Sequence, residues 1–362
     1  LTRSSAASDV YKRQPKELCT YQHFFLYLKV QNVFKFMNMK KILLLCLTTL
    51  LSAATISAAT ITSTQSGNWN SASTWDSGSI PTNADDVIIA TGHTVNVINS
   101  AGVAESVTVN SGGKLRVYKT LTVDNTSANA GTLSINETDG VLILSAGNFT
   151  NSGTLQIAKS RQMTMANSTT LTNSGSIVIT SDSDEFGTLV LNGTYTASGS
   201  GSVTYGRYVS GESNNWDLIG SPVTGQDAAD FISSNGDIAE NSGDYGIGPY
   251  NNDTNTWTTW NTSDAISNGN LVSGKGYQMA NASTGAAMEF TGGINAGSVS
   301  VSVINNDAAN SGNGTRFNLV ANPYPSFINA NNNAGTNNFI KTNGVNASGA
   351  VSYTHLTLPT IE

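Results

Sequence analysis

The chain has 362 residues, a net charge of −7 at pH 7, two cysteines and three histidines. This acidic balance disfavours nucleic acid and anionic lipid as partners, since both carry negative charge. Such sparse cysteine and histidine also argue against a zinc cluster and a disulfide framework.

The two ends of the chain resemble translations of one oligonucleotide. One codon set for Ser4–Gln14 has a reverse complement that, in a shifted frame, encodes Val351–Thr360. We therefore expect residues 1–14 and 348–362 to be adapter-derived, flanking a truncated metagenomic open reading frame. Residues 15–36 are interpreted as translated upstream DNA, the alternative being a natural N-terminal extension.

Residues 37–59 have the order of a secretory signal peptide. A start at Met37 or Met39 is followed by two lysines, a short apolar run over Ile42–Leu51 and small residues that end at Ala59. The apolar run is shorter than the roughly 20 residues of a membrane-spanning helix. We expect cleavage near Ala59, a secreted or cell-surface location and no transmembrane span.

The expected mature span, residues 60–350, is more acidic than the whole chain. It holds 9 Lys and Arg against 21 Asp and Glu, a net charge of −12. Both cysteines lie outside it, and His93 is its single histidine. We expect His93 to be structural, because nucleophilic catalysis needs a base paired with its nucleophile.

Between residues 112 and 205, apolar residues recur in pairs at i and i+2, punctuated by glycine. Period two with glycine punctuation is typical of short strands with one buried face. The pairs are Leu115/Val117, Leu133/Ile135, Leu155/Ile157, Ile177/Ile179, Leu189/Leu191 and Val203/Tyr205.

A repeat of 22 residues runs through this region, because Thr150–Ile157 (TNSGTLQI) aligns with Thr172–Ile179 (TNSGSIVI). Strand-and-turn repeats of this length predict a β-solenoid over residues 60–206, in which stacked coils share one core. Asn151 and Asn173 would then stack at equivalent corners, where amides hydrogen-bond between coils. An ordinary β-sandwich is the alternative.

The segment before the repeat carries a tryptophan-containing motif. It reads Gly67-Asn-Trp69, Ser73-Thr-Trp75, Asp85-Asp-Val-Ile-Ile89 and Gly92-His-Thr-Val95. This motif resembles the opening segment of bacterial surface proteins built on right-handed β-helices, and also the start of the eight-glycine extracellular domain. A solenoid needs a cap over its first coil, so we expect Trp69 and Trp75 to close that end. Asp85 and Asp86 are expected to satisfy a turn.

After Tyr205 the pattern changes to longer units that bear aromatic residues. They include Trp216–Val223 (WDLIGSPV), Gly274–Tyr277 (GKGY) and Asn318–Pro325 (NLVANPYP). This order resembles a region of large secreted bacterial proteins that use type IX secretion. The resemblance implies export, with the secretion machinery as a partner through a C-terminal sorting domain missing from this chain. We expect residues 207–347 to form an antiparallel β-sandwich-like domain with a short helix over Asp227–Phe231.

Acidic residues cluster in one loop of the repeat region. Asp182, Asp184 and Glu185 form either a solvated turn or a calcium site, since calcium takes clustered carboxylate oxygens. No other cofactor is expected. Lys159 and Arg161 lie near this loop in the repeat, which leaves a polysaccharide lyase as a further hypothesis.

Aromatic residues cluster in the second domain. Trp257, Trp260, Tyr250 and Tyr277 either pack in the core or form a platform on which sugar rings stack. The leading hypothesis is an exported all-β protein with a structural or adhesive role, no catalytic activity, and glycans or cell-surface material as partners. The alternative is a carbohydrate-binding or polysaccharide-degrading β-helix protein.

Overall fold

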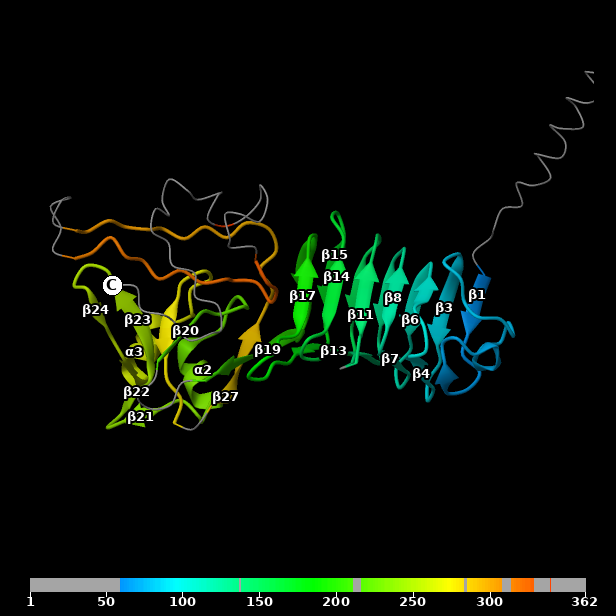
Figure 1. Ribbon diagram of the computed structural model, residues 1–362, viewed down its shortest axis with the longest axis horizontal. Helices are drawn as coiled ribbons and strands as arrows, with labels where there is room; N and C mark the ends of the chain where they lie inside the picture. The colour runs from blue at the N-terminus through cyan, green and yellow to red at the C-terminus, as the bar shows by residue number, and fades with distance from the viewer. Residues whose placement is uncertain are drawn as a thin grey trace, which may run out of the picture. The chain divides into compact units, whose positions relative to one another are not determined.

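The structure is a computed structural model that describes residues 59–328, except 137, 211–215, 283–284 and 308–313, and also residue 339. The expected adapter, upstream and signal segments up to residue 58 lie outside the described residues, as does the expected adapter tail. The described chain is a β-solenoid followed by antiparallel sheets (Figure 1), which confirms the predicted fold class.

Three sheets, here called I, II and III, build the solenoid; their strands are parallel except for β27 at the end of sheet II, and a full coil adds one strand to each. Sheet I contains β1 (Ala59–Thr62), β3 (Asp85–Ile89), β6 (Ser106–Val109), β9 (Ser127–Asn129), β12 (Phe149–Asn151), β15 (Thr170–Asn173) and β18 (Thr194–Ala197). Sheet II contains β2 (Gly67–Asn68), β4 (Thr94–Val97), β7 (Lys114–Val117), β10 (Thr132–Ile135), β13 (Thr154–Ile157), β16 (Ser176–Ile179), β19 (Ser202–Val209) and β27 (Ala286–Gly292). Sheet III contains β5 (Gly102–Ala104), β8 (Thr120–Val123), β11 (Val141–Leu144), β14 (Gln162–Met165) and β17 (Thr188–Leu191).

The pairing register confirms the 22-residue repeat. In sheet II, Leu133 pairs with Leu155 and Leu155 with Ile177. In sheet I, Asn151 pairs with Asn173. These parallel pairs between successive coils exclude an ordinary sandwich for this part of the chain, because a sandwich would pair neighbouring strands antiparallel.

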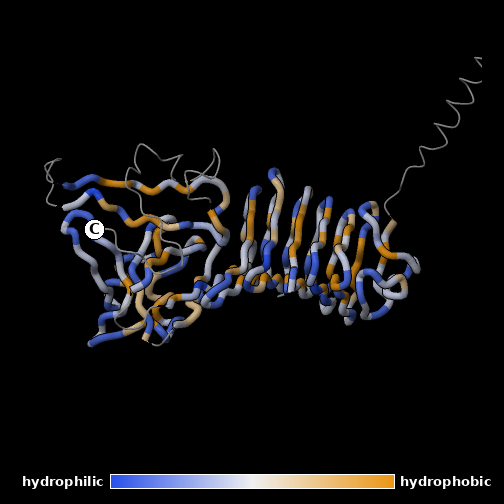
Figure 2. The backbone as a smooth tube through the Cα atoms, in the orientation of Figure 1, coloured by the Kyte–Doolittle hydropathy of each residue, from blue (hydrophilic) through white to orange (hydrophobic). Residues whose placement is uncertain are grey.

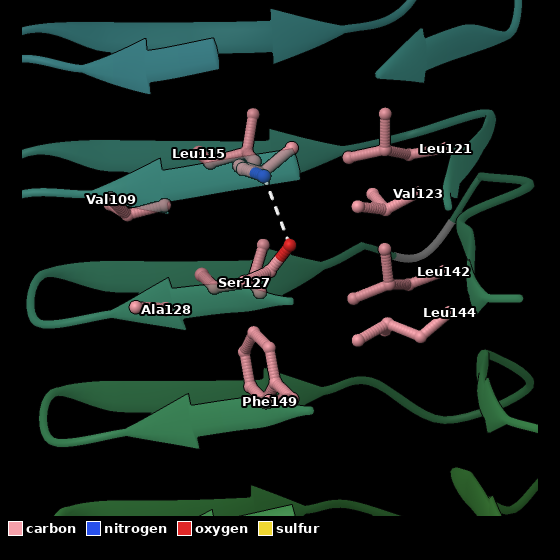
Figure 3. A pocket seen from close by; sticks show the side chains of 11 residues that line it. Val109, Leu115, Leu121, Val123, Ser127, Ala128, Leu142, Leu144 and Phe149 are labelled. Atoms are coloured by element: carbon pink, nitrogen blue, oxygen red, sulfur yellow. Dashed lines mark hydrogen bonds between the residues drawn. The ribbon is translucent and has the colours of Figure 1, made fainter. Parts of the chain in front are cut away.

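Inward-facing apolar side chains form a continuous core, while polar residues alternate with them along each coil (Figure 2). Figure 3 shows Leu115, Leu121, Leu142 and Phe149 pointing into the space between the sheets, where Ser127 Oγ accepts a bond from the Val107 amide (2.9 Å). The small gap that they line is apolar, and such gaps stay dry. It therefore represents imperfect packing rather than a ligand site.

Glycines form a column at the corner before sheet II. A Cβ added at Gly153 would lie 2.1 Å from the carbonyl oxygen of Gly131, and one at Gly175 would lie 2.1 Å from that of Gly153. The backbones of neighbouring coils approach too closely there for any side chain. This contact explains the glycine of the TNSG repeat.

A buried asparagine ladder occupies the same corner. Asn129 Nδ2 donates to Asn151 Oδ1, and Asn151 Nδ2 donates to Asn173 Oδ1, both over 2.8 Å. Each amide also donates to a backbone carbonyl of the following coil, at Thr154, Ser176 and Ser202 in turn. The predicted stacking of Asn151 and Asn173 is confirmed, and Asn129 extends it by one coil.

The first coil is closed by the two predicted tryptophans. Trp69 and Trp75 are buried and pack edge to face with ring centroids 5.2 Å apart. Trp75 Nε1 donates to the Trp69 carbonyl over 2.8 Å, just after the 3₁₀ helix η1 (Ala72–Thr74). His93 Nδ1 lies 3.0 Å from Ser63 Oγ, so the imidazole joins two coils as a structural residue.

The predicted turn role of Asp85 is also confirmed, since its Oδ2 accepts from both the amide and the hydroxyl of Thr82 (2.7 Å each). Asp86 instead accepts a bond from Ser106 Oγ in the next coil (2.5 Å). Both acidic residues therefore have partners within the fold.

The second domain consists of short antiparallel strands and two helices. One sheet has the order β20 (Asp217–Ile219), β26 (Tyr277–Met279), β23 (Ile247–Asn251) and β24 (Thr256–Trp257). The other has the order β21 (Glu240–Asn241), β22 (Asp244–Tyr245) and β25 (Trp260–Asn261). No helix in the described part of the chain has the length and apolar content needed to cross a bilayer.

The first helix of this domain, α2 (Ala228–Ser234), lies where the sequence predicts it and is capped by Asp227, whose carboxylate accepts from the amides of Ala229 and Asp230. The second, α3 (Thr262–Asn268), differs from the expectation of a single short helix in this domain. A capping box between Asn261 and Asp264 starts it, and such a pair is a start signal readable from sequence.

The predicted boundary at residues 206 and 207 falls inside a strand rather than a linker. β19 pairs parallel with β16 through Ser202–Tyr205 and antiparallel with β27 through Val203–Val209. The last coil and the second domain therefore share sheet II.

Candidate functional site

The acidic loop lies between β16 and β17. Asp182 Oδ1 accepts bonds from the amides of Asp184 (3.1 Å) and Glu185 (2.9 Å), and its Oδ2 accepts one from Lys159 Nζ (2.5 Å). The bond from Lys159, reinforced by the bond from the Asp184 amide, lowers the pKa of the Asp182 carboxyl. Its oxygens are therefore occupied in closing a turn.

This geometry favours the turn over the calcium site. Among residues 59–328 as described, no group of three or more His, Cys, Asp or Glu side chains is arranged to hold a metal ion. The proposed ligands Asp182, Asp184 and Glu185 thus do not assemble into a calcium site. The structural reason is that Asp182 faces Lys159 and the loop backbone.

The two basic residues of the lyase hypothesis have different surroundings. Lys159 forms an ion pair with Asp182. The pKa of the Asp139 carboxyl is lowered mainly by its bond from Lys119, and the positive charge of Arg161 adds to this effect. Lys159 is therefore bonded to Asp182, whereas the charge of Arg161 makes the smallest of the contributions that lower the pKa of Asp139.

The predicted aromatic platform divides into a buried half and an exposed half. Trp260 and Tyr277 are 5% and 2% exposed, with ring centroids 5.4 Å apart in an edge-to-face contact. Burial raises the pKa of the Tyr277 phenol, whose oxygen accepts a bond from the Val272 amide (3.0 Å). These two rings belong to the core and offer no open face to a sugar, which corrects this half of the prediction.

The exposed Trp257 and the half-buried Tyr250 form the other half, on the paired strands β23 and β24. Their ring centroids lie 5.0 Å apart with the planes tilted by 52°, and Trp257 is 47% exposed. The Tyr250 hydroxyl donates to Asn255 Oδ1 (2.9 Å) and lies 2.6 Å from Thr315 Oγ1. An ordered, amphipathic ring pair of this kind can stack on a flat ligand while the neighbouring amides and hydroxyls bond to it.

The three motifs of the second domain meet around its core. Ile219 of the WDLIGSPV motif pairs with Tyr277 of the GKGY motif. The Gly276 amide of the GKGY motif donates to the carbonyl of Leu319 in the NLVANPYP motif (3.0 Å). The Leu189 amide of β17 donates to the Pro325 carbonyl (2.8 Å), so the third motif also covers the end of sheet III. These motifs are explained by packing and pairing.

A half-buried cation that the sequence did not single out lies where the solenoid meets this domain. The Arg207 guanidinium lies 5.3 Å from the centroid of the Phe186 ring and donates to the Tyr208 carbonyl (2.7 Å). Burial lowers the pKa of Arg207 to about 10 and raises that of the neighbouring Tyr205 to about 12. Both residues stand on β19, and their contacts lie within the protein.

The outer faces of the solenoid carry in-register rows of polar side chains. On sheet I, Thr150 lies beside Thr172 and Thr172 beside Thr196. The sequence analysis considered the inward-facing apolar residues and did not predict these outward rows. The T-x-T pairs Thr170/Thr172 and Thr194/Thr196 are the signal that could have predicted them, because residues two apart on a strand share one face.

Fold and surface together define a β-solenoid protein with an attached antiparallel β domain. The chain belongs to a family described as a domain of unknown function (DUF8693), which matches residues 60–167 and 146–360. The two matches overlap over residues 146–167, the length of one coil. No curated protein and no solved structure matches the chain.

Proposed function

We propose that this protein is an exported, cell-surface or secreted protein with a structural or adhesive role and no catalytic step. The observation that carries the proposal is the set of outer rows on the solenoid, where identical polar side chains repeat in register from coil to coil. Solenoids present extended, regular surfaces that suit attachment. In the described chain, Lys119 pairs with Asp139, Lys159 pairs with Asp182, and Asp182 also accepts bonds from the loop backbone.

Export is supported by the sequence from Met37 to Ala59 and by the resemblance to proteins of type IX secretion. The compact unit that contains all the described residues begins at Ala58, one residue before the expected cleavage site. N-terminal sequencing of protein collected from the medium or cell surface of a secreting host is expected to start at Thr60. Retention inside the cell with an uncleaved N-terminus would contradict export.

Adhesion can be tested with the full chain immobilised on beads and offered to surfaces coated with glycans or cell-wall material. We expect retention that survives washing and exceeds that of beads carrying an unrelated acidic protein. Equal retention of both bead types on every surface would reject the adhesive role.

Carbohydrate binding is a second candidate function, favoured by the exposed Trp257 and its half-buried neighbour Tyr250. If sugars stack there, Trp257→Ala should weaken glycan binding about tenfold or more, the equivalent of about 1.4 kcal/mol. Trp216→Ala is the matched control, because Trp216 is 45% exposed and stands apart from this pair in sequence. Equal binding by both variants would remove the pair from the binding surface.

A further inference from the structure

One row of outward side chains runs the whole length of sheet I. Its members lie directly beside one another in the pairing register of successive strands, and each is partly or fully exposed. The row is Thr62, Ile88, Thr108, Ala128, Thr150, Thr172 and Thr196.

On the first three and the last two strands of sheet I, a second row lies beside the first, two residues earlier. Thr60, Asp86 and Ser106 begin it, and Thr170 and Thr194 end it. Neighbouring strands are about 4.7–4.9 Å apart, and two residues along a strand span about 6.6–6.8 Å. The first row therefore presents a methyl group on every strand of sheet I and a hydroxyl on five of the seven strands.

The hydroxyls of the first row are free to bond outward. Over the described residues, those of Thr62, Thr108, Thr150, Thr172 and Thr196 make no hydrogen bond to another protein group. In the second row, by contrast, Thr170 and Thr194 bond to each other (Oγ1 to Oγ1, 2.9 Å). Because Thr is branched at Cβ and stiff at χ1, the free hydroxyls hold a narrow range of directions.

The outer face of sheet I carries few charged residues, although the protein is acidic. The first row holds no charged residue, and Asp86 is the one charged member of the five second-row positions named above. The exposed cations Lys114 and Arg116 stand on sheet II instead. Such a surface complements an uncharged partner whose own groups repeat at the spacing of the strands.

We propose that the outer face of sheet I binds ice, a periodic and uncharged lattice of water. Water molecules bonded to the fixed hydroxyls, with methyl groups between them, would take positions close to the oxygen repeats of an ice surface. A rigid sheet loses little conformational freedom on such binding. A crystalline polysaccharide is the less favoured partner, because neither row supplies an aromatic ring at the positions named.

The test uses the full chain and measures the fraction of protein incorporated into a slowly grown ice crystal, together with inhibition of ice recrystallisation. We expect the native protein to enter the ice, and Thr150→Tyr or Thr172→Tyr, each in the middle of the row, to lower incorporation about tenfold. The matched control is Thr122→Tyr, because Thr122 faces outward at an equivalent position on sheet III. Thermal unfolding followed by circular dichroism verifies that all variants are folded.

The proposal is overturned if the native protein is excluded from ice like an unrelated soluble protein. It is also overturned if Thr122→Tyr lowers incorporation as strongly as Thr150→Tyr in folded protein. Glycan retention measured on the same samples separates the two proposals, because it tests adhesion independently of the threonine rows. Retention on crystalline polysaccharide that depends on Thr150, without entry into ice, would assign the face to that partner and reject ice.

Discussion

The side-chain amide of Asn151 donates to Asn173 Oδ1 over 2.8 Å inside the solenoid, and both residues are 0% exposed. Asn151→Ala removes this bond, the bond from Asn129 and the bond to the Ser176 carbonyl. Because buried partners are left unsatisfied, we expect a loss of about 2–4 kcal/mol in the free energy of unfolding. Denaturant unfolding followed by far-UV circular dichroism measures it.

The control for this change is Asn167→Ala, since Asn167 is exposed in a turn of the same coil region. We expect that substitution to change the unfolding free energy by less than about 0.5 kcal/mol. Similar losses in the two variants would show that the ladder contributes no special stability.

The glycine column predicts a steric penalty. Gly153→Ala would place a methyl group 2.1 Å from the Gly131 carbonyl oxygen, so the two coils must separate. We expect a loss of more than about 2 kcal/mol, comparable to overpacking in a core. Gly236→Ala is the control, because nothing lies within 4 Å of its added Cβ. A Gly153 variant as stable as the Gly236 variant would contradict the close approach of the coils.

The tryptophan cap predicts a graded effect at Trp75. Trp75→Phe keeps a ring but leaves the Trp69 carbonyl without its partner, which should cost about 1–3 kcal/mol. Trp75→Ala also opens a cavity and should cost about 3–5 kcal/mol. Thermal unfolding of both variants ranks them. The reverse order, or no loss in either, would mean that the cap does not stabilise the first coil.

Burial raises the pKa of Tyr205 from 10.0 to about 12, which predicts a loss of stability in alkali. A raised folded-state pKa gives a contribution that is complete below pH 10 and is lost as the pH rises through about 12. Two pH units correspond to about 2–3 kcal/mol. Tyr205→Phe should lack this part of the pH dependence in unfolding experiments from pH 9 to 12. Identical alkaline curves for both proteins would contradict a buried, neutral phenol.

Much of the solenoid could be predicted because its signals are local and repeated. Period-two pairs and the TNSG corner identify inward residues and the offset between coils, and both Asn151 and Asn173 were placed correctly. The approach of Gly153 to Gly131 is the physical origin of that repeat. Helix α3 was missed although the pair Asn261 and Asp264 marks its start.

The candidate site was harder to predict, because exposure is decided by long-range packing. Trp257 and Trp260 are three residues apart, yet one is 47% exposed and the other 5%. Pairing of β23 with β24 leaves Trp257 at a sheet edge, whereas Trp260 packs on Tyr277. The ion pair between Asp182 and Lys159 could not be predicted either, since Lys159 precedes Asp182 by a whole coil in the sequence.

The most direct test of the proposed role is to incubate the full chain with insoluble and soluble polysaccharides, and to measure both bound protein and released product. The account predicts retention on at least one material with no new reducing ends and no unsaturated sugars, the products of hydrolase and lyase action. Product release that disappears in both Lys159→Ala and Asp182→Asn, with folding intact, would contradict it. That result would establish a polysaccharide-degrading enzyme.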